Sequence, residues 1–93
     1  MVLGLLQLWI RVPDAMSLKD KRRAIKSIKD RIANRFNVSV AEVGLLDSRR
    51  EAQLAVAMVS NDSSFAQSSL SKVVNLVRRV VKLQLLDYSI EMI

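Results

Sequence analysis

The sequence predicts a two-layer α+β fold whose elements follow the order β-α-β-β-α-β. The chain of 93 residues has the length of one domain, residues 1–93, with one two-layer core. Four segments alternate apolar and polar residues with the period of a strand, and two longer segments repeat apolar residues at helical spacing. This order is the ferredoxin-like one, a four-stranded antiparallel sheet with both helices on one face and the first and third strands central.

The first half of the chain predicts a strand and then a helix. The strand is expected over residues 2–12, where Leu6, Leu8 and Ile10 share the face towards the core. Ser17 then begins the helix, because its hydroxyl can accept a hydrogen bond from a free backbone N–H of the first turn. The apolar stripe of this helix consists of Leu18, Ile25, Ile28, Ile32 and Phe36.

The second half predicts two strands, a helix and a closing strand. Residues 38–46 and 52–60 are expected to be strands, joined by a polar turn. The second helix begins within the segment NDSS and ends near Lys82, and the last strand covers residues 83–93. The apolar face of the last strand is predicted to hold Leu86, Tyr88, Ile90 and Met92.

The composition disfavours several classes of protein. The chain has no Cys and no His, which removes disulfides, thiolate metal sites and the commonest general base. The loop RVPDAMS after the first strand has no glycine with which to form a phosphate cradle. We therefore expect no enzyme, no catalytic residue, no metal and no cofactor. The apolar start of the chain is too short for a membrane span and lacks the features of a signal peptide, so we expect no membrane association and a cytoplasmic protein.

The first helix is strongly basic. Residues 17–36 hold eight basic and two acidic residues, and this surplus equals the net charge of +6 of the whole chain. Such a surface favours contact with phosphates, because Lys and Arg release counterions from nucleic acids. The alternative is a solvated helix face, since Lys and Arg are good helix formers. The predicted nucleic-acid-binding residues are Lys19, Arg22, Arg23 and Lys26, with Lys29 at the edge; Arg31 and Arg35 are placed on the opposite flank of the apolar stripe.

The open face of the predicted sheet offers a second candidate surface. Trp9 on a central strand could stack an RNA base, but the third strand has Ala55 and Ala57 where a stacking platform needs aromatic residues. A flat apolar surface with one Trp fits another protein better, including a second copy of this chain. The predicted interface residues are Leu5, Trp9, Ala55, Ala57 and Val59.

Two charged residues lie at unusual positions. Lys21 projects near the apolar stripe of the first helix, and we expect its stem to cover the end of the sheet while its amine reaches solvent. A contact of Lys21 with a ligand is the alternative. Glu42 lies in the middle of a predicted strand, and we expect an ion pair with Arg11, Arg49 or Arg50.

Three motifs resemble the YlxP family of small bacterial proteins: SLKDKRR after the first strand, RFNVSVAEV, and AVAMVSND. The resemblance covers nearly the whole chain, with the motifs in the expected order. It implies a ferredoxin-like fold and supplies no catalytic residues. It also implies a link to translation, because genes of this family often lie beside those for translation initiation and ribosome maturation.

The sequence thus supports three hypotheses of function. The first is a non-enzymatic binding protein that contacts ribosomal RNA or the ribosome through the basic helix. The second is a protein–protein interaction module, such as a homodimer, that uses the open sheet face. The third is a regulatory domain that binds a small molecule.

Overall fold

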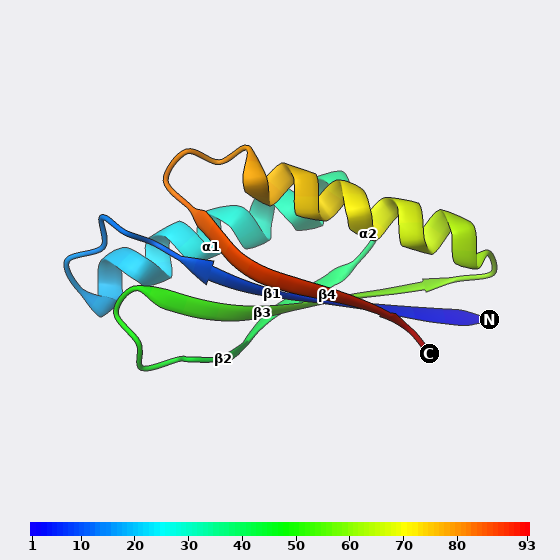
Figure 1. The fold of residues 1–93 in the computed structure, drawn as a ribbon, viewed down its shortest axis with the longest axis horizontal. Coiled ribbons are helices and arrows are strands. Elements are labelled where there is room, and N and C mark those ends of the chain that lie inside the picture. The colour runs from blue at the N-terminus through cyan, green and yellow to red at the C-terminus, as the bar shows by residue number, and fades with distance from the viewer.

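The computed structural model describes every residue from Met1 to Ile93 and has the predicted order of elements. The four strands form one antiparallel sheet in the order β2-β3-β1-β4. Both helices cover the same face of the sheet, and the other face has no helix (Figure 1). The predicted ferredoxin-like α+β fold is confirmed. Its elements are β1 (Val2–Arg11), α1 (Leu18–Arg35), β2 (Ser39–Gly44), β3 (Glu51–Ser60), α2 (Ser63–Arg78) and β4 (Gln84–Met92).

The two central strands set the core. β1 and β3 pair along their whole lengths, from Val2 opposite Ser60 to Arg11 opposite Glu51. Paired residues of an antiparallel sheet share a face, so alternate residues of both strands point towards the helices. The side chains buried there include those that the spacing of the first strand and first helix points inwards, namely Leu6, Leu8, Ile10, Ile25, Ile28 and Ile32. They also include Leu54, Val56, Met58, Leu70, Val73 and Val77 of β3 and α2.

Both helices begin at a capping side chain. Oγ of Ser17 accepts a hydrogen bond from the N–H of Asp20 at 3.1 Å, as predicted. Oδ1 of Asp62 accepts bonds from two N–H groups in the first turn of α2. α2 ends at Arg78, earlier than expected, because two successive turns follow it and carry Leu83 into the core.

A bulge in β4 changes the predicted apolar face of that strand. The register against β1 shifts between Trp9 and Ile10, so that Ile10 lies opposite Leu85. Leu85 therefore packs against the core, and Leu86 is 47% exposed. The placement of Leu86 on the core face was wrong, since a period of two cannot reveal an extra residue. At its other end β4 continues into a pair of hydrogen bonds between Leu3 and Ile93, which holds the two termini at one end of the molecule (Figure 1).

Candidate nucleic-acid interface

A fully buried lysine anchors the first turn of α1 to the hairpin between β2 and β3. Nζ of Lys21 donates to Oε2 of Glu42 at 3.0 Å, to the carbonyl of Leu45 at 2.9 Å and to that of Glu51 at 3.1 Å. These three acceptors match the three protons of the ammonium group, and the carbonyl of Leu46 is a fourth and longer contact at 3.5 Å. Leu45 has a positive φ of 58°, the only such residue in the chain. The strained backbone conformation of the hairpin therefore occurs at the residue whose carbonyl accepts a hydrogen bond from Lys21.

This contact corrects two predictions. Lys21 is 0% exposed, so its amine does not reach solvent. Glu42 pairs with Lys21 and with none of the three arginines expected as partners. Helical spacing placed Lys21 beside the apolar stripe correctly. The carboxylate of Glu42 and the carbonyl groups of the hairpin lie close to its amine only because the chain folds back over α1.

The predicted nucleic-acid-binding residues lie on the solvent side of α1. Lys19, Arg22, Arg23 and Lys26 are exposed, and Lys29 is half-buried at the edge of the cluster. Lys26 forms an ion pair with Asp30 at 2.9 Å, in which both side chains are largely exposed. This pair is weak in water, so the cluster keeps most of its positive field. We call Lys19, Arg22, Arg23 and Lys26 the outer patch.

The opposite flank of α1 joins a second set of cations from α2. Arg35 and Phe36 at the end of α1 line a hollow together with Lys72, Asn75, Leu76 and Arg79. Three bases therefore meet there without an acid among the lining residues. Helical spacing predicts Arg35 on that flank. It does not predict that Lys72 and Arg79 of α2 lie beside Arg35, because these residues come together only when the two helices pack. The residues Arg35, Lys72 and Arg79 are called the helix groove below.

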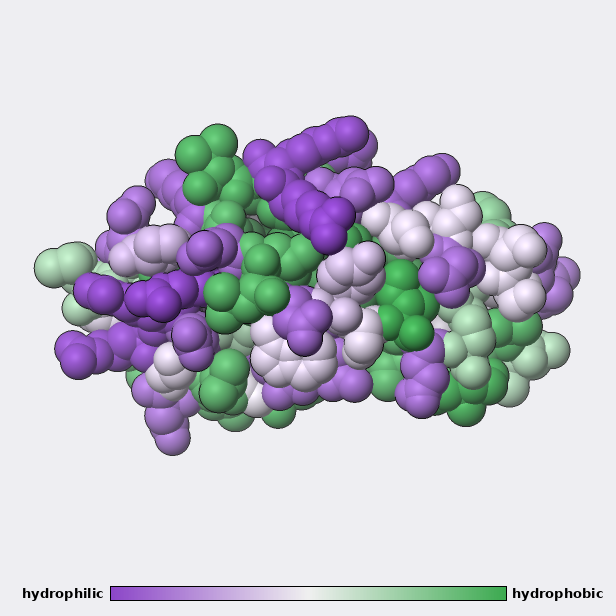
Figure 2. All heavy atoms as spheres, in the orientation of Figure 1, coloured by the Kyte–Doolittle hydropathy of each residue, from purple (hydrophilic) through white to green (hydrophobic).

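The positive charge of the helix layer is poorly compensated. Of the fifteen Lys and Arg residues, only Lys21 and Lys26 take part in ion pairs. Two of the acids near the helices are occupied as hydrogen-bond acceptors at helix starts, namely Asp20 and Asp62. Figure 2 shows hydrophilic side chains projecting from the helix layer, with apolar ones between them and along the side of the molecule where β4 lies.

The open face of the sheet carries the predicted interface residues. Leu5 lies opposite Ala57 and Trp9 opposite Gln53, so these side chains share that face with Ala55. Leu5, Trp9, Ala55 and Ala57 are half-buried, and Val59 is 65% exposed. Along β4 the same face turns acidic, because Asp87 lies opposite Trp9 and Glu91 opposite Leu5. The two faces of the molecule therefore differ in charge.

Neither helix is long and apolar enough to cross a membrane. No group of three or more Asp or Glu side chains converges in a way that could hold a metal ion.

The fold and the surface define a small ferredoxin-like domain with a basic helix layer. The chain belongs to the family described as "Protein of unknown function (DUF503)", whose model matches residues 3–90. It is 38% identical over 60 residues to the uncharacterized protein YlxP of Bacillus subtilis (strain 168). That alignment covers 64% of this chain and 65% of the length of the relative. The resemblance to the YlxP family is thereby confirmed.

Proposed function

We propose that this protein is a non-enzymatic RNA-binding protein of the cytoplasm that contacts the phosphates of ribosomal RNA through its helix layer. The observation that carries the proposal is the uncompensated positive charge of one face, which combines the outer patch with the helix groove. RNA phosphates are the most abundant polyanion with which such a surface gains free energy by counterion release. The acidic side chains of Asp87 and Glu91 on the open sheet face favour this orientation, since they would repel the same strand.

The contacts expected are with the phosphate backbone rather than with base edges. The outer patch consists of flexible, exposed side chains on one helix and offers few rigidly held donors. Side chains of this kind position a protein on a nucleic acid but do not read its sequence. Binding is therefore expected to depend on the shape and charge density of a structured RNA and to fall steeply with salt.

The test is a titration of a structured ribosomal RNA fragment at two salt concentrations. The wild-type protein is compared with the variant Lys19→Gln/Arg22→Gln/Arg23→Gln/Lys26→Gln. We expect the variant to lose most of its affinity at low salt while it folds normally. Equal affinities of the two proteins, or no binding by either at low salt, would leave the basic surface of α1 as a solvated helix face.

A second candidate function is self-association through the open sheet face. The register of β1 and β3 supports it, because Leu3 and Leu5 form an apolar strip with Ala55, Ala57 and Val59. Trp9 lies beyond this strip, past the hydrogen-bonded side chains of Gln7 and Gln53. An apolar surface that extends over two adjacent strands is stabilised when a second surface covers it. Salt would affect this association little, which separates it from RNA binding in the same set of experiments.

A further inference from the structure

A hollow of about 460 Å³ lies between α1 and the turn that connects α2 with β4. Its volume falls within the range of about 300–1,000 Å³ that small-molecule sites occupy. Half of its twelve lining residues are apolar and form a continuous floor: Val12, Ala15, Ala24, Ile28, Val80 and Leu83. A flat apolar group could lie on this floor and displace water from it.

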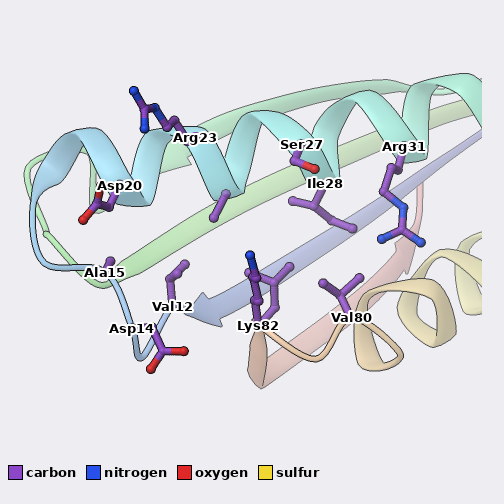
Figure 3. Close-up of a pocket in the computed structure, with 12 residues that line it drawn as sticks. Val12, Asp14, Ala15, Asp20, Arg23, Ser27, Ile28, Arg31, Val80 and Lys82 are labelled. Carbon is purple, nitrogen blue, oxygen red and sulfur yellow. The ribbon is translucent and has the colours of Figure 1, made fainter.

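Two cations border this floor from opposite elements, within a lining whose charged residues are three bases and the two acids Asp14 and Asp20. Arg31 extends from α1 towards the connecting turn, and Lys82 extends from that turn towards α1 (Figure 3). Neither side chain takes part in an ion pair or in a hydrogen bond. Both are exposed at the mouth of the hollow, so an anionic group bound there would meet two unused donors at small desolvation cost.

The arrangement fits a ligand that joins a flat apolar ring system to a phosphate. The guanidinium of Arg31 can donate two parallel hydrogen bonds to a phosphate, and the ammonium of Lys82 can meet the same phosphate as a point charge. The outer patch extends to the same place, because Arg23 also lines the hollow. An RNA strand held along α1 would therefore pass the mouth of the hollow.

We infer that this hollow is a nucleotide subsite, which takes one unstacked nucleotide of an RNA strand with its base on the apolar floor and its phosphate between Arg31 and Lys82. The inference deepens the proposed function and rests on it for the source of the nucleotide. A free mononucleotide has the same chemistry and is the other source, which the experiment separates from RNA.

The first measurement follows the base itself. A single-stranded RNA oligonucleotide with 2-aminopurine at one internal position fluoresces more strongly when that base leaves the stack. We expect the wild-type protein to increase this fluorescence on binding. Ala24→Phe fills the hollow without changing any charge, so this variant should still bind the oligonucleotide by anisotropy but should no longer increase the fluorescence. An equal increase with Ala24→Phe, or binding by wild type with no increase, would overturn the inference.

The second measurement tests the hollow with a free mononucleotide, so its outcome does not depend on RNA binding. Adenosine monophosphate is titrated into the protein, and NMR follows the methyl groups of Ala24, Ile28 and Val80. We expect these signals to shift in the wild type, and we expect Arg31→Gln/Lys82→Gln to weaken the nucleotide about tenfold through loss of two charge-assisted contacts. Both replaced side chains are exposed, so this variant should fold even if Ala24→Phe does not.

The two measurements separate failure of the subsite from failure of the proposed function. Methyl shifts with the mononucleotide but no affinity for any RNA would refute RNA binding and leave the hollow as a site for free nucleotides. RNA binding without an increase in fluorescence and without methyl shifts would refute the subsite and leave the proposed function standing. Absence of all three signals would refute both.

Discussion

Nζ of the buried Lys21 lies 3.0 Å from Oε2 of Glu42, and this ion pair joins the first turn of α1 to the strand β2. The two residues are 21 positions apart in the sequence. The pair fixes the start of α1 against the hairpin of β2 and β3, and the outer patch begins in that same turn. The orientation of the basic surface therefore depends on a contact in the interior.

The first prediction concerns the stability that this pair provides. Lys21→Met keeps the apolar stem but leaves the carboxylate of Glu42 and the carbonyls of Leu45 and Glu51 without their donor. We expect a loss of about 3–5 kcal/mol in the free energy of unfolding, because removal of one partner leaves a buried charge uncompensated. Urea denaturation measures this loss.

The matched control for that prediction lies on the same helix. Lys26→Met also removes a lysine from an ion pair, but both side chains of the Lys26–Asp30 pair are largely exposed. Its cost should be less than about 1 kcal/mol. Similar losses for the two variants would mean that Lys21 contributes no more than a surface pair.

The second prediction concerns the salt dependence of RNA binding. If all four residues of the outer patch contact phosphates, log Kd should change with log salt with a slope of roughly 3 to 4, from about 0.7–0.9 per contact. The variant with Gln at all four positions should lose this slope together with the affinity. Fluorescence anisotropy at several salt concentrations gives the slope.

The third prediction distinguishes RNA binding by the outer patch from attraction of RNA by the net positive charge of the protein. Arg22→Gln/Arg23→Gln and Arg11→Gln/Arg49→Gln remove the same charge, but Arg11 lies on the open sheet face and Arg49 in the hairpin of β2 and β3, so neither belongs to the outer patch. The first pair of substitutions should weaken RNA binding far more than the second. Equal effects would show that net charge alone attracts RNA and that the outer patch has no particular part in binding.

The fourth prediction concerns the open sheet face. If a second copy covers this face, the fluorescence of Trp9 should be blue-shifted, and Trp9→Asp should convert the dimer to a monomer, because it would bury a charge in an apolar contact. Sedimentation at high micromolar concentration measures the oligomeric state. Val81→Asp is the control, since Val81 is 98% exposed in the turn after α2, away from the sheet face. A monomeric wild-type protein would exclude self-association.

The fifth prediction compares the two glycines. A Cβ atom at Gly4 would lie 2.9 Å from Cδ1 of Leu70, which is fully buried on α2. Gly4→Ala should therefore destabilise the fold by about 1–3 kcal/mol, because the buried side chain of Leu70 must leave its position in the packed core. At Gly44 the nearest atoms belong to the side chain of Gln53, which is only partly buried and can move away at the cost of its hydrogen bond to Gln7. Gly44→Ala should cost less, and thermal unfolding of both variants tests the difference.

Local spacing along the chain is enough to predict the fold and the position of the basic helix. Amphipathic periods identify strands and helices because the pleat and the helical turn dictate which side chains share a face. The same geometry placed Ile25, Ile28 and Ile32 in the core and the outer patch in solvent, as the structure has them. These features depend on residues close together in the chain, so local spacing is enough to predict them.

Features that join distant segments of the chain become visible only in the folded structure. The pairing of Lys21 with Glu42 depends on how the hairpin of β2 and β3 folds over α1, and the exposure of Leu86 depends on a bulge against β1. The helix groove and the hollow likewise combine Arg31 and Arg35 with side chains from α2 and its following turn. A periodic pattern predicts the direction in which a side chain points. It does not predict the residue that the side chain contacts, because that contact depends on packing across the whole sheet.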